Sequence, residues 1–396
     1  MIKVNYYPSE NFLNRYEQKV VTEGLIPAFS AMSLKASKID KQRISALFTD
    51  QFIKDLVLCD ANELYEKIFI IYDKLHELSE RYCLEYYLKD IDLDPSVTSM
   101  PIRKKTEKEI IKAINKKVLI KLRLLSNERQ SIYLPLIIRK MESAVLASDI
   151  KAQLTSLNSM KIGNHTLSDK IKALYPDWVN EFVKVFNYEA ISKFFGHEIT
   201  NGLSLDICPY CNNEDIETIN EKGAETRPDL DHFFPKSKFP FLALTLSNLI
   251  PAGGRCNQRY KRDASMLGYV HPYISGITQE ILFNFNFMFD EGRSKDALDI
   301  TVNKLNNDLD KNLELFKIRA NHNKNNVKDW FIKLDERYQL LLNTSNENAE
   351  EILNSKDLIR LRLDVDLDKS PTKEQYQKLK IDALNFLTGR SYDIAD

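Results

Sequence analysis

The chain has 396 residues, of which 43% are hydrophobic and 29% are charged, and its formal net charge is −1. This length and composition indicate two or three folded domains and exclude a single small module. The apolar stretches, such as residues 68–72, are far too short to cross a bilayer, and residues 1–8 do not resemble a signal peptide, so we expect a cytoplasmic protein without membrane contact.

Residues 1–200 are predicted to be mostly helical. In the clearest helix, apolar residues are spaced three and four apart behind Asp60 and Glu63, a pair typical of a capping box. The residues of this stripe, which we expect in the core, are Leu64, Ile68, Ile71, Leu75, Leu78 and Tyr82. Cys59 and Cys83 lie in similar apolar patterns and are also predicted to be buried.

Residues 103–123 form a basic stretch, although the net charge of the whole chain gives no sign of an anionic partner. Its basic residues are Arg103, Lys104, Lys105, Lys108, Lys112, Lys116, Lys117, Lys121 and Arg123. We favour a solvated helix face for this stretch over a track for nucleic-acid phosphates. A further helix is expected around residues 188–195, ending near Gly196.

From residue 201 to residue 273 the helical periodicity fades, and Gly, Pro, Cys, His and Asn become frequent. Three of the five cysteines, Cys208, Cys211 and Cys256, fall in this polar region. An odd number of cysteines grouped with histidine favours metal binding over a disulfide framework. We therefore expect the chemistry of the protein to lie here.

A β-hairpin is predicted next, because four phenylalanines alternate with polar or smaller residues over residues 283–289. Residues 290–292 are expected to form its turn and residues 298–302 its second strand. Phenylalanines spaced two apart more often face a core than stack on bases, so we favour a core face. Helices then return, with an apolar stripe from Val327 to Leu341 and a final helix from Ser370-Pro371 to Gly389.

The central region carries Asp231-His232, then Asn248 followed by Leu-Ile-Pro, then Cys256-Asn257 followed by basic residues. Together these motifs resemble the HNH, or ββα-metal, nuclease family. In that family a strand ends in Asp-His, a second strand carries the middle Asn, and a helix supplies the last Asn. The resemblance covers about residues 188–290 of this chain.

The resemblance implies a site that hydrolyses phosphodiester bonds with one Mg²⁺ or Mn²⁺ ion. His232, as a neutral imidazole, is expected to activate water, and Asp231 and Asn257 are expected to hold the metal through oxygen atoms. We expect the amide oxygen of Asn248 to accept the Nδ1 proton of His232, which leaves Nε2 free. The residues expected to contact phosphates beside the cut are Arg255, Arg259, Lys261, Arg262 and Lys236.

A Cys-Pro-Tyr-Cys sequence at residues 208–211 resembles the first knuckle of the zinc ribbon that many HNH nucleases carry. A full ribbon needs a second Cys-x-x-Cys, but the residue three before Cys256 is Gly253. His271 could complete a structural zinc site of three cysteines and one histidine, with Asp215 or water as the next candidates. Alternatively, the knuckle has kept its fold without a metal.

We expect an α+β fold that is mostly α-helical and has three regions. Residues 1–200 form a helical region that positions substrate, binds a partner or regulates the nuclease. Residues 201–275 form the ββα-metal module with its zinc-ribbon-like knuckle, and residues 276–396 form the β-hairpin and further helices.

The resemblance is to bacterial antiphage and restriction-type HNH proteins in particular. It implies DNA as the substrate, a role in defence and, as in some relatives, an ATPase partner. One alternative is a stand-alone restriction nuclease that depends on a modified base and flips it into an aromatic pocket. The other is a non-catalytic zinc-ribbon protein that binds nucleic acid or serves as a scaffold.

Overall fold

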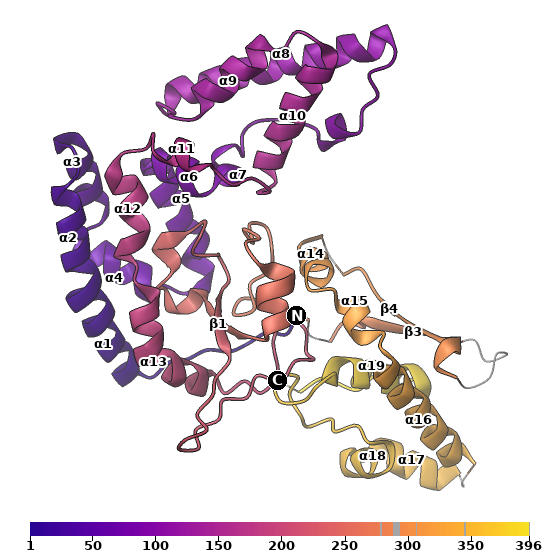
Figure 1. The fold of residues 1–396 in the computed structure, drawn as a ribbon. Coiled ribbons are helices and arrows are strands. Elements are labelled where there is room, and N and C mark those ends of the chain that lie inside the picture. The colour runs from indigo at the N-terminus through magenta and orange to yellow at the C-terminus, as the bar shows by residue number, and fades with distance from the viewer. Residues whose placement is uncertain (278, 288–293, 306, 344–345, 396) are drawn as a thin grey trace.

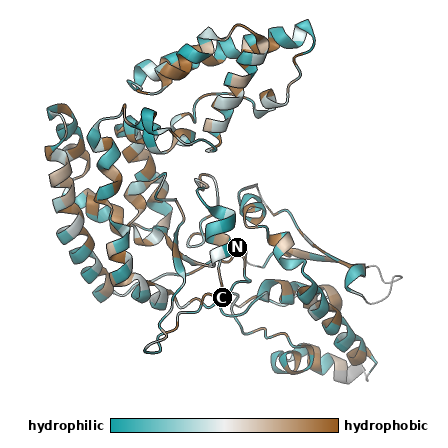
Figure 2. Cartoon of the chain, in the orientation of Figure 1, coloured by the Kyte–Doolittle hydropathy of each residue, from teal (hydrophilic) through white to brown (hydrophobic). Residues whose placement is uncertain are grey.

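The computed structural model describes residues 1–277, 279–287, 294–305, 307–343 and 346–395. Helices dominate, and the described strands form two small antiparallel sheets, so the expected α+β, mostly helical fold is confirmed (Figure 1). Hydrophilic and hydrophobic residues are interspersed along the helices in Figure 2, as expected for helices with one face on a core. No helix in the described ranges is long and apolar enough to span a membrane.

The first 203 residues are helical, as expected. Their helices are α1 (Glu10–Tyr16), α2 (Ile26–Leu34), α3 (Lys38–Leu47), α4 (Asp50–Leu58), α5 (Leu64–Lys74), α6 (His76–Tyr82), α7 (Leu84–Tyr87), α8 (Lys105–Glu128), α9 (Leu134–Ser143), α10 (Ala147–Lys161), α11 (Asp169–Lys172), α12 (Asp177–Val185) and α13 (Tyr188–Leu203). A π-helical segment, Glu17–Leu25, joins α1 to α2. In Figure 1, α8, α9 and α10 form a group apart from the other helices of this region.

The predicted core stripe of α5 and α6 is confirmed. Both halves of the capping box are present at Asp60 and Glu63. The stripe residues are buried except Tyr82, which is partly buried, and the thiols of Cys59 and Cys83 are buried as well. The lysines of α8 are exposed, as the prediction of a solvated face requires.

The predicted end of α13 is wrong, because the helix runs through Gly196 and stops only at Ser204, whose backbone is left-handed (φ 49°). Glycine lowers helix stability but does not end a helix where neighbours pack against it. Gly196 is buried on the face of α13 that meets Arg227.

The central region contains β1 (Asp229–His232) and β2 (Leu249–Ala252), which pair antiparallel with Asp229 opposite Ala252 and His232 opposite Leu249. The helix Arg255–Lys261, wound as a π-helix, follows β2. This order of strand, strand and helix is the local arrangement expected from the sequence. The order of the elements does not by itself identify a nuclease module, which is defined by the side chains at its site.

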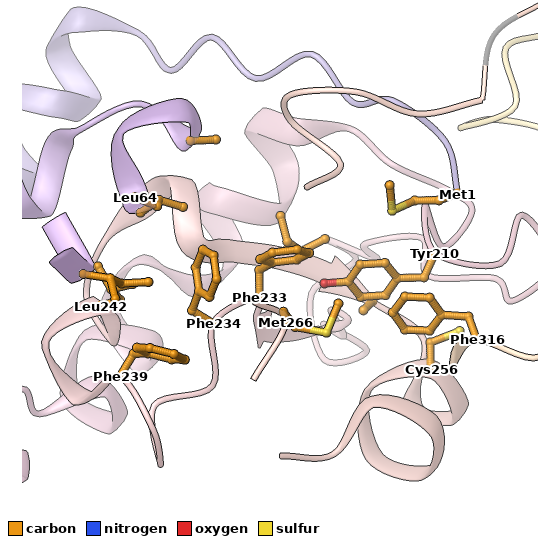
Figure 3. Close-up of a cluster of buried hydrophobic side chains, with 14 of the residues drawn as sticks. Met1, Leu64, Tyr210, Phe233, Phe234, Phe239, Leu242, Cys256, Met266 and Phe316 are labelled. Carbon is orange, nitrogen blue, oxygen red and sulfur yellow. The ribbon is translucent and has the colours of Figure 1, made fainter. Parts of the chain in front are cut away.

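The core of the central region is shared with both flanking regions (Figure 3). The ring of Phe234 packs edge-on against Tyr65 of α5 with centroids 5.2 Å apart. The ring of Tyr210 stacks on Phe316 at 4.3 Å and 9°. The hydroxyl of Tyr16 donates a hydrogen bond to the carbonyl of Leu244 at 2.9 Å. The central region is therefore held between the N-terminal and C-terminal helices.

The C-terminal hairpin is formed by β3 (Phe283–Phe287) and β4 (Leu298–Val302). The phenylalanines of β3 are buried, which confirms a core face. Phe289 and the predicted turn at residues 290–292 lie outside the described residues. The helices that follow are α14 (Asn307–Leu315), α15 (Ile318–His322), α16 (Asn325–Leu342), α17 (Asn346–Asn354), α18 (Lys356–Leu363) and α19 (Gln377–Thr388).

The predicted start of the final helix is wrong, whereas its end at Gly389 is confirmed. Residues 370–376 form turns, in which the hydroxyl of Ser370 accepts a hydrogen bond from the amide of Thr372 at 3.3 Å. The backbone of Tyr376 is left-handed (φ 57°), and α19 begins at the next residue. Serine side chains that bond to nearby amides favour turns over helix interiors, and here that preference outweighs the proline signal.

Candidate functional site

A cavity of about 370 Å³ opens beside the end of β1. The two strands and the helix Arg255–Lys261 bring Asp231, His232 and Asn257 to its wall. Lys236, Lys261 and Arg262 line the same cavity. Six of the residues that the sequence analysis singled out therefore meet at one place.

The carboxylate of Asp231 is buried, with 4% of the residue exposed. One oxygen accepts a hydrogen bond from the hydroxyl of Tyr210 at 2.7 Å, and the other pairs with Nζ of Lys261 at 2.9 Å. The same ammonium group donates to the carbonyl of His232 at 2.7 Å. A buried carboxylate requires such a counter-charge. The prediction that Lys261 contacts flanking phosphates is therefore wrong, because its ammonium group is buried in this pair.

His232 has its Nε2 atom 3.0 Å from the carbonyl oxygen of Ala243. A carbonyl oxygen only accepts, so Nε2 carries the proton and Nδ1 is the basic nitrogen. Burial is the main cause that lowers the pKa of His232 to about 3; the hydrogen bond to the Ala243 carbonyl opposes it, and the charges of Lys236 and Lys261 add to it. The imidazole is therefore neutral at physiological pH. The ring of Tyr188 packs edge-on against it, with centroids 4.4 Å apart.

Asn248 does not bond to His232, so the predicted hydrogen bond between them is wrong. Its Oδ1 accepts from the amide of Phe234 at 2.8 Å, and its Nδ2 donates to the carbonyls of Phe234 and Leu242, both at 3.0 Å. The side chain is fully buried and ties together the two ends of the loop between β1 and β2. Because this loop presents Ala243 to His232, Asn248 positions the histidine indirectly.

Asn257 is partly buried at the cavity wall, and its side-chain amide has no hydrogen-bond partner among the described residues. Its oxygen and the carboxylate of Asp231 are the hard donors that Mg²⁺ and Mn²⁺ prefer. Each carboxylate oxygen of Asp231 keeps a second lone pair beside the bonds from Tyr210 and Lys261. The residues present at the cavity therefore fit a hard cation.

Lys236 and Arg262 are exposed at the rim of the cavity, where Nζ of Lys236 lies 5.0 Å from the ring centre of Tyr188. The structure does not bring Arg255 and Arg259 to the cavity wall. Arg255 instead donates a hydrogen bond to Asn321 at 3.1 Å. In a helix of only seven residues, sequence spacing does not predict which basic side chains point toward the cavity and which point away from it.

The thiols of Cys208, Cys211 and Cys256 converge in a second place, together with the carboxylate of Glu214. Their ligand atoms all lie within 4.8 Å of one another, and the three thiols are buried and free. Hydrogen bonds from the other two thiols, that of Cys208 first, hold the pKa of Cys211 well below its usual range. This cluster could hold a metal ion such as zinc.

Glu214 is the fourth member of this cluster, a place for which the sequence analysis predicted His271. A Cβ atom added at Gly253 would lie 2.6 Å from the Glu214 carboxyl group, so this carboxyl fills the space of the absent fourth cysteine. The amides of Arg255 and Cys256 donate to it at 3.1 and 3.3 Å. The sequence signal for Glu214 is its place three residues after Cys211, which the analysis passed over.

The predicted zinc ligand His271 is wrong. Its Nδ1 accepts from the amide of Tyr273 at 3.1 Å, and its ring packs 4.2 Å from that of Phe233. Burial lowers its pKa to about 3, so the ring is neutral and belongs to the core. The fallback candidate Asp215 lies outside the cluster as well, since its carboxylate accepts from the amide of Glu217.

Two further residues at the cavity, Tyr188 and Arg227, were not predicted as site residues. Arg227 lies four residues before Asp231, outside the motif, and Tyr188 belongs to a helix without a motif. Sequence spacing alone does not predict that either residue lines a site.

Comparisons of the chain with protein-family models, with curated proteins and with solved structures found no match. The resemblance to HNH nucleases therefore stays an expectation from the motifs. The chemistry of the cavity carries the interpretation of function.

Proposed function

We propose that this chain is a metal-dependent HNH endonuclease that cuts DNA. The observation that carries the proposal is the convergence of Asp231, His232 and Asn257 on one cavity with Lys236 and Arg262 at its rim. A neutral imidazole, two oxygen donors and surrounding cations are the groups that phosphodiester hydrolysis requires.

In the proposed reaction, Nδ1 of His232 removes a proton from a water molecule in the cavity. The oxygen of that water bonds to phosphorus while the bond from phosphorus to the 3′ oxygen breaks, leaving 5′-phosphate and 3′-hydroxyl ends. The 3′ oxygen takes its proton from solvent, and the imidazolium later releases one. A phosphate beside the ring would raise the pKa of His232 for this step, because an anion stabilises the imidazolium.

Asp231 and Asn257 are the residues that would hold Mg²⁺ or Mn²⁺. Such an ion, when bound, supplies positive charge for the phosphate and the leaving oxygen. Lys261 has a different role in this proposal, since its buried ammonium group orients Asp231 through their ion pair.

The cysteine cluster is proposed to hold a structural zinc ion through Cys208, Cys211, Cys256 and Glu214. Thiolates and a carboxylate are ligands that tetrahedral zinc accepts, and a structural zinc stabilises segments with little regular structure. The segment 204–228 has few regular elements, which makes it such a case. A defence role and an ATPase partner are proposed from the resemblance alone.

Nicking of a supercoiled plasmid by the purified chain tests the nuclease proposal. We expect open-circle product with Mg²⁺ or Mn²⁺ and none with EDTA. His232→Ala should lower the nicking rate by about 10² to 10⁴, the range contributed by a general base. His197→Ala is the matched control, because His197 is exposed on α13 and does not line the cavity.

The melting temperatures of both variants show whether each is folded. If folded His232→Ala nicks the plasmid at the wild-type rate, the assignment of His232 as the general base is wrong. Metal-independent binding without any nicking would instead favour the non-catalytic nucleic-acid-binding alternative.

A further inference from the structure

Arg227 lies just before β1 and reaches across to α13, where its guanidinium group is held by neutral acceptors. Its Nη1 donates to the carbonyl of Pro228 at 2.9 Å. Its Nη2 donates to the hydroxyl of Ser192 at 2.8 Å and to the carbonyl of the same residue at 3.4 Å. These bonds fix the direction of the guanidinium while leaving its charge in place.

Gly196 of α13 provides the space for this guanidinium. A Cβ atom at residue 196 would lie 2.6–2.7 Å from three atoms of the Arg227 guanidinium group. Because the end of an arginine side chain is flexible, a larger residue at this position would push Arg227 aside rather than break the helix. The absence of a side chain at Gly196 therefore leaves the space in which the Arg227 guanidinium group lies.

The positive charge of Arg227 is not neutralised by the described part of the chain, where no carboxylate lies within 4.0 Å of it. The carboxylates that line the cavity have other partners: Asp229 accepts from Gln258 at 3.0 Å, Asp263 accepts from Ser237 at 2.8 Å, and Asp231 pairs with Lys261 at 2.9 Å. Arg227 lines the same cavity as His232. A partly buried guanidinium held by neutral groups at a cavity wall is suited to an anion, since arginine binds phosphate through two parallel hydrogen bonds.

We infer that Arg227 binds a backbone phosphate of the nucleic acid next to the phosphate that is cut, an inference that rests on the proposed function. The contact joins the helical region to the nuclease chemistry, because Ser192 and Gly196 of α13 hold the arginine in place. Phosphate contacts fix the register of a bound strand. The helical region thereby helps to decide which bond reaches His232.

Binding of a fluorescent 30-base-pair duplex to the full chain in EDTA tests this inference without cleavage. Fluorescence anisotropy between 50 and 200 mM salt gives both the affinity and its salt dependence. We expect Arg227→Gln and Gly196→Ala each to weaken binding about tenfold, the value of a charged hydrogen bond. The slope of log affinity against log salt should become less steep by about 0.9, the loss of one phosphate contact.

Gly202→Ala is the matched control. Gly202 lies on the same helix, and nothing is within 4 Å of a Cβ atom there. Both glycine variants gain the same helix propensity, so only the displacement of Arg227 distinguishes them. Unchanged binding by Arg227→Gln, or equal loss in Gly196→Ala and Gly202→Ala, would overturn the inference. Weaker binding by Arg227→Gln but not by Gly196→Ala would overturn the role given to Gly196.

The two proposals fail separately. If the duplex binds and both variants weaken it, the Arg227 contact stands even when plasmid nicking is never seen. If the plasmid is nicked and the Arg227 variants bind and nick like the wild type, the proposed function stands and this inference falls.

Discussion

Glu214 contributes the fourth ligand atom of the cysteine cluster, and it lies beside Gly253. The carboxyl group of Glu214 occupies the space that a side chain at residue 253 would need, and the amides of Arg255 and Cys256 hold it there. Three cysteines and one glutamate therefore present four ligand atoms within 4.8 Å of one another. This arrangement depends on distances between residues about 40 positions apart, so cysteine spacing does not reveal it.

The zinc proposal predicts that Glu214→Ala loses the metal. Elemental analysis after dialysis against a chelator should give about one zinc per wild-type chain and much less in Glu214→Ala, because three thiolates hold zinc less tightly than four ligands. The double variant Glu214→Gly with Gly253→Cys should recover the zinc, since it removes both the carboxyl group and the Cβ atom of Glu214, which lie 2.6 and 2.7 Å from a Cβ atom at residue 253.

His271→Gln is the control for that measurement and should keep its zinc. The assignment of Glu214 is wrong if Glu214→Ala retains the metal while His271→Gln loses it. Absence of zinc from the wild-type chain would leave the knuckle as a fold without a metal.

The loop between β1 and β2 lines part of the candidate cavity through Pro235, Lys236 and Ser237. Asn248 closes it with three hydrogen bonds to backbone groups of Phe234 and Leu242. The carbonyl of Ala243 within it fixes the proton of His232 on Nε2. Asn248 therefore holds the loop in place, and the loop in turn positions His232.

Asn248→Ala should lower the free energy of unfolding by about 2–4 kcal/mol, because buried backbone groups lose their partners. Urea unfolding measures the change. Asn257→Ala is the matched control, since its amide has no hydrogen-bond partner among the described residues and its loss should cost less than about 1 kcal/mol. Equal destabilisation by the two variants would contradict the separate roles given to the two asparagines.

Periodicity predicted the elements that carry a regular apolar stripe. The stripe of α5 and α6 and the phenylalanines of β3 follow from apolar spacing, which reports burial directly. The end of α13 and the start of α19 were wrong because local signals at Gly196 and Pro371 were outweighed by packing and by turn bonds.

The motifs likewise predicted which residues gather at the cavity better than what each one bonds to. Asp231, His232 and Asn257 meet as expected. The partners of Lys261 and Asn248 were wrong, because a side chain of either type reaches several groups and only the folded chain decides among them.

At the scale of the whole molecule, the core of the central region is continuous with the cores of its flanks. Thr245 donates a hydrogen bond to the carbonyl of Leu56 in α4 at 2.9 Å, and Tyr6 stacks on Tyr273 at 5.5 Å. His271 is buried against Phe233 of the same region, and the carbonyl of the next residue, Pro272, accepts a hydrogen bond from the amide of Val4 at 2.9 Å. A charge placed on His271 would therefore disturb the core of the central region beside its contact with the N-terminal segment.

The buried histidine predicts how stability changes with pH. The pKa of His271 is lowered by burial to about 3, whereas an unfolded histidine titrates near ~6.5, so protons bind the unfolded chain preferentially. The contribution of His271 is thus complete above pH 6.5 and is lost as pH falls toward 3. Between pH 6.5 and pH 5 the loss is about 2 kcal/mol, at 1.4 kcal/mol for each pH unit.

Urea unfolding of the full chain at pH 7.5 and pH 5 isolates this contribution by comparison of variants. His271→Gln removes the titrating group, so the fall in unfolding free energy between the two pH values should shrink by about 2 kcal/mol, whatever the variant costs at pH 7.5. His197→Gln, at an exposed histidine, should leave the fall unchanged. If His271→Gln falls as steeply as the wild type, His271 is not held neutral, and the core around it tolerates its charge.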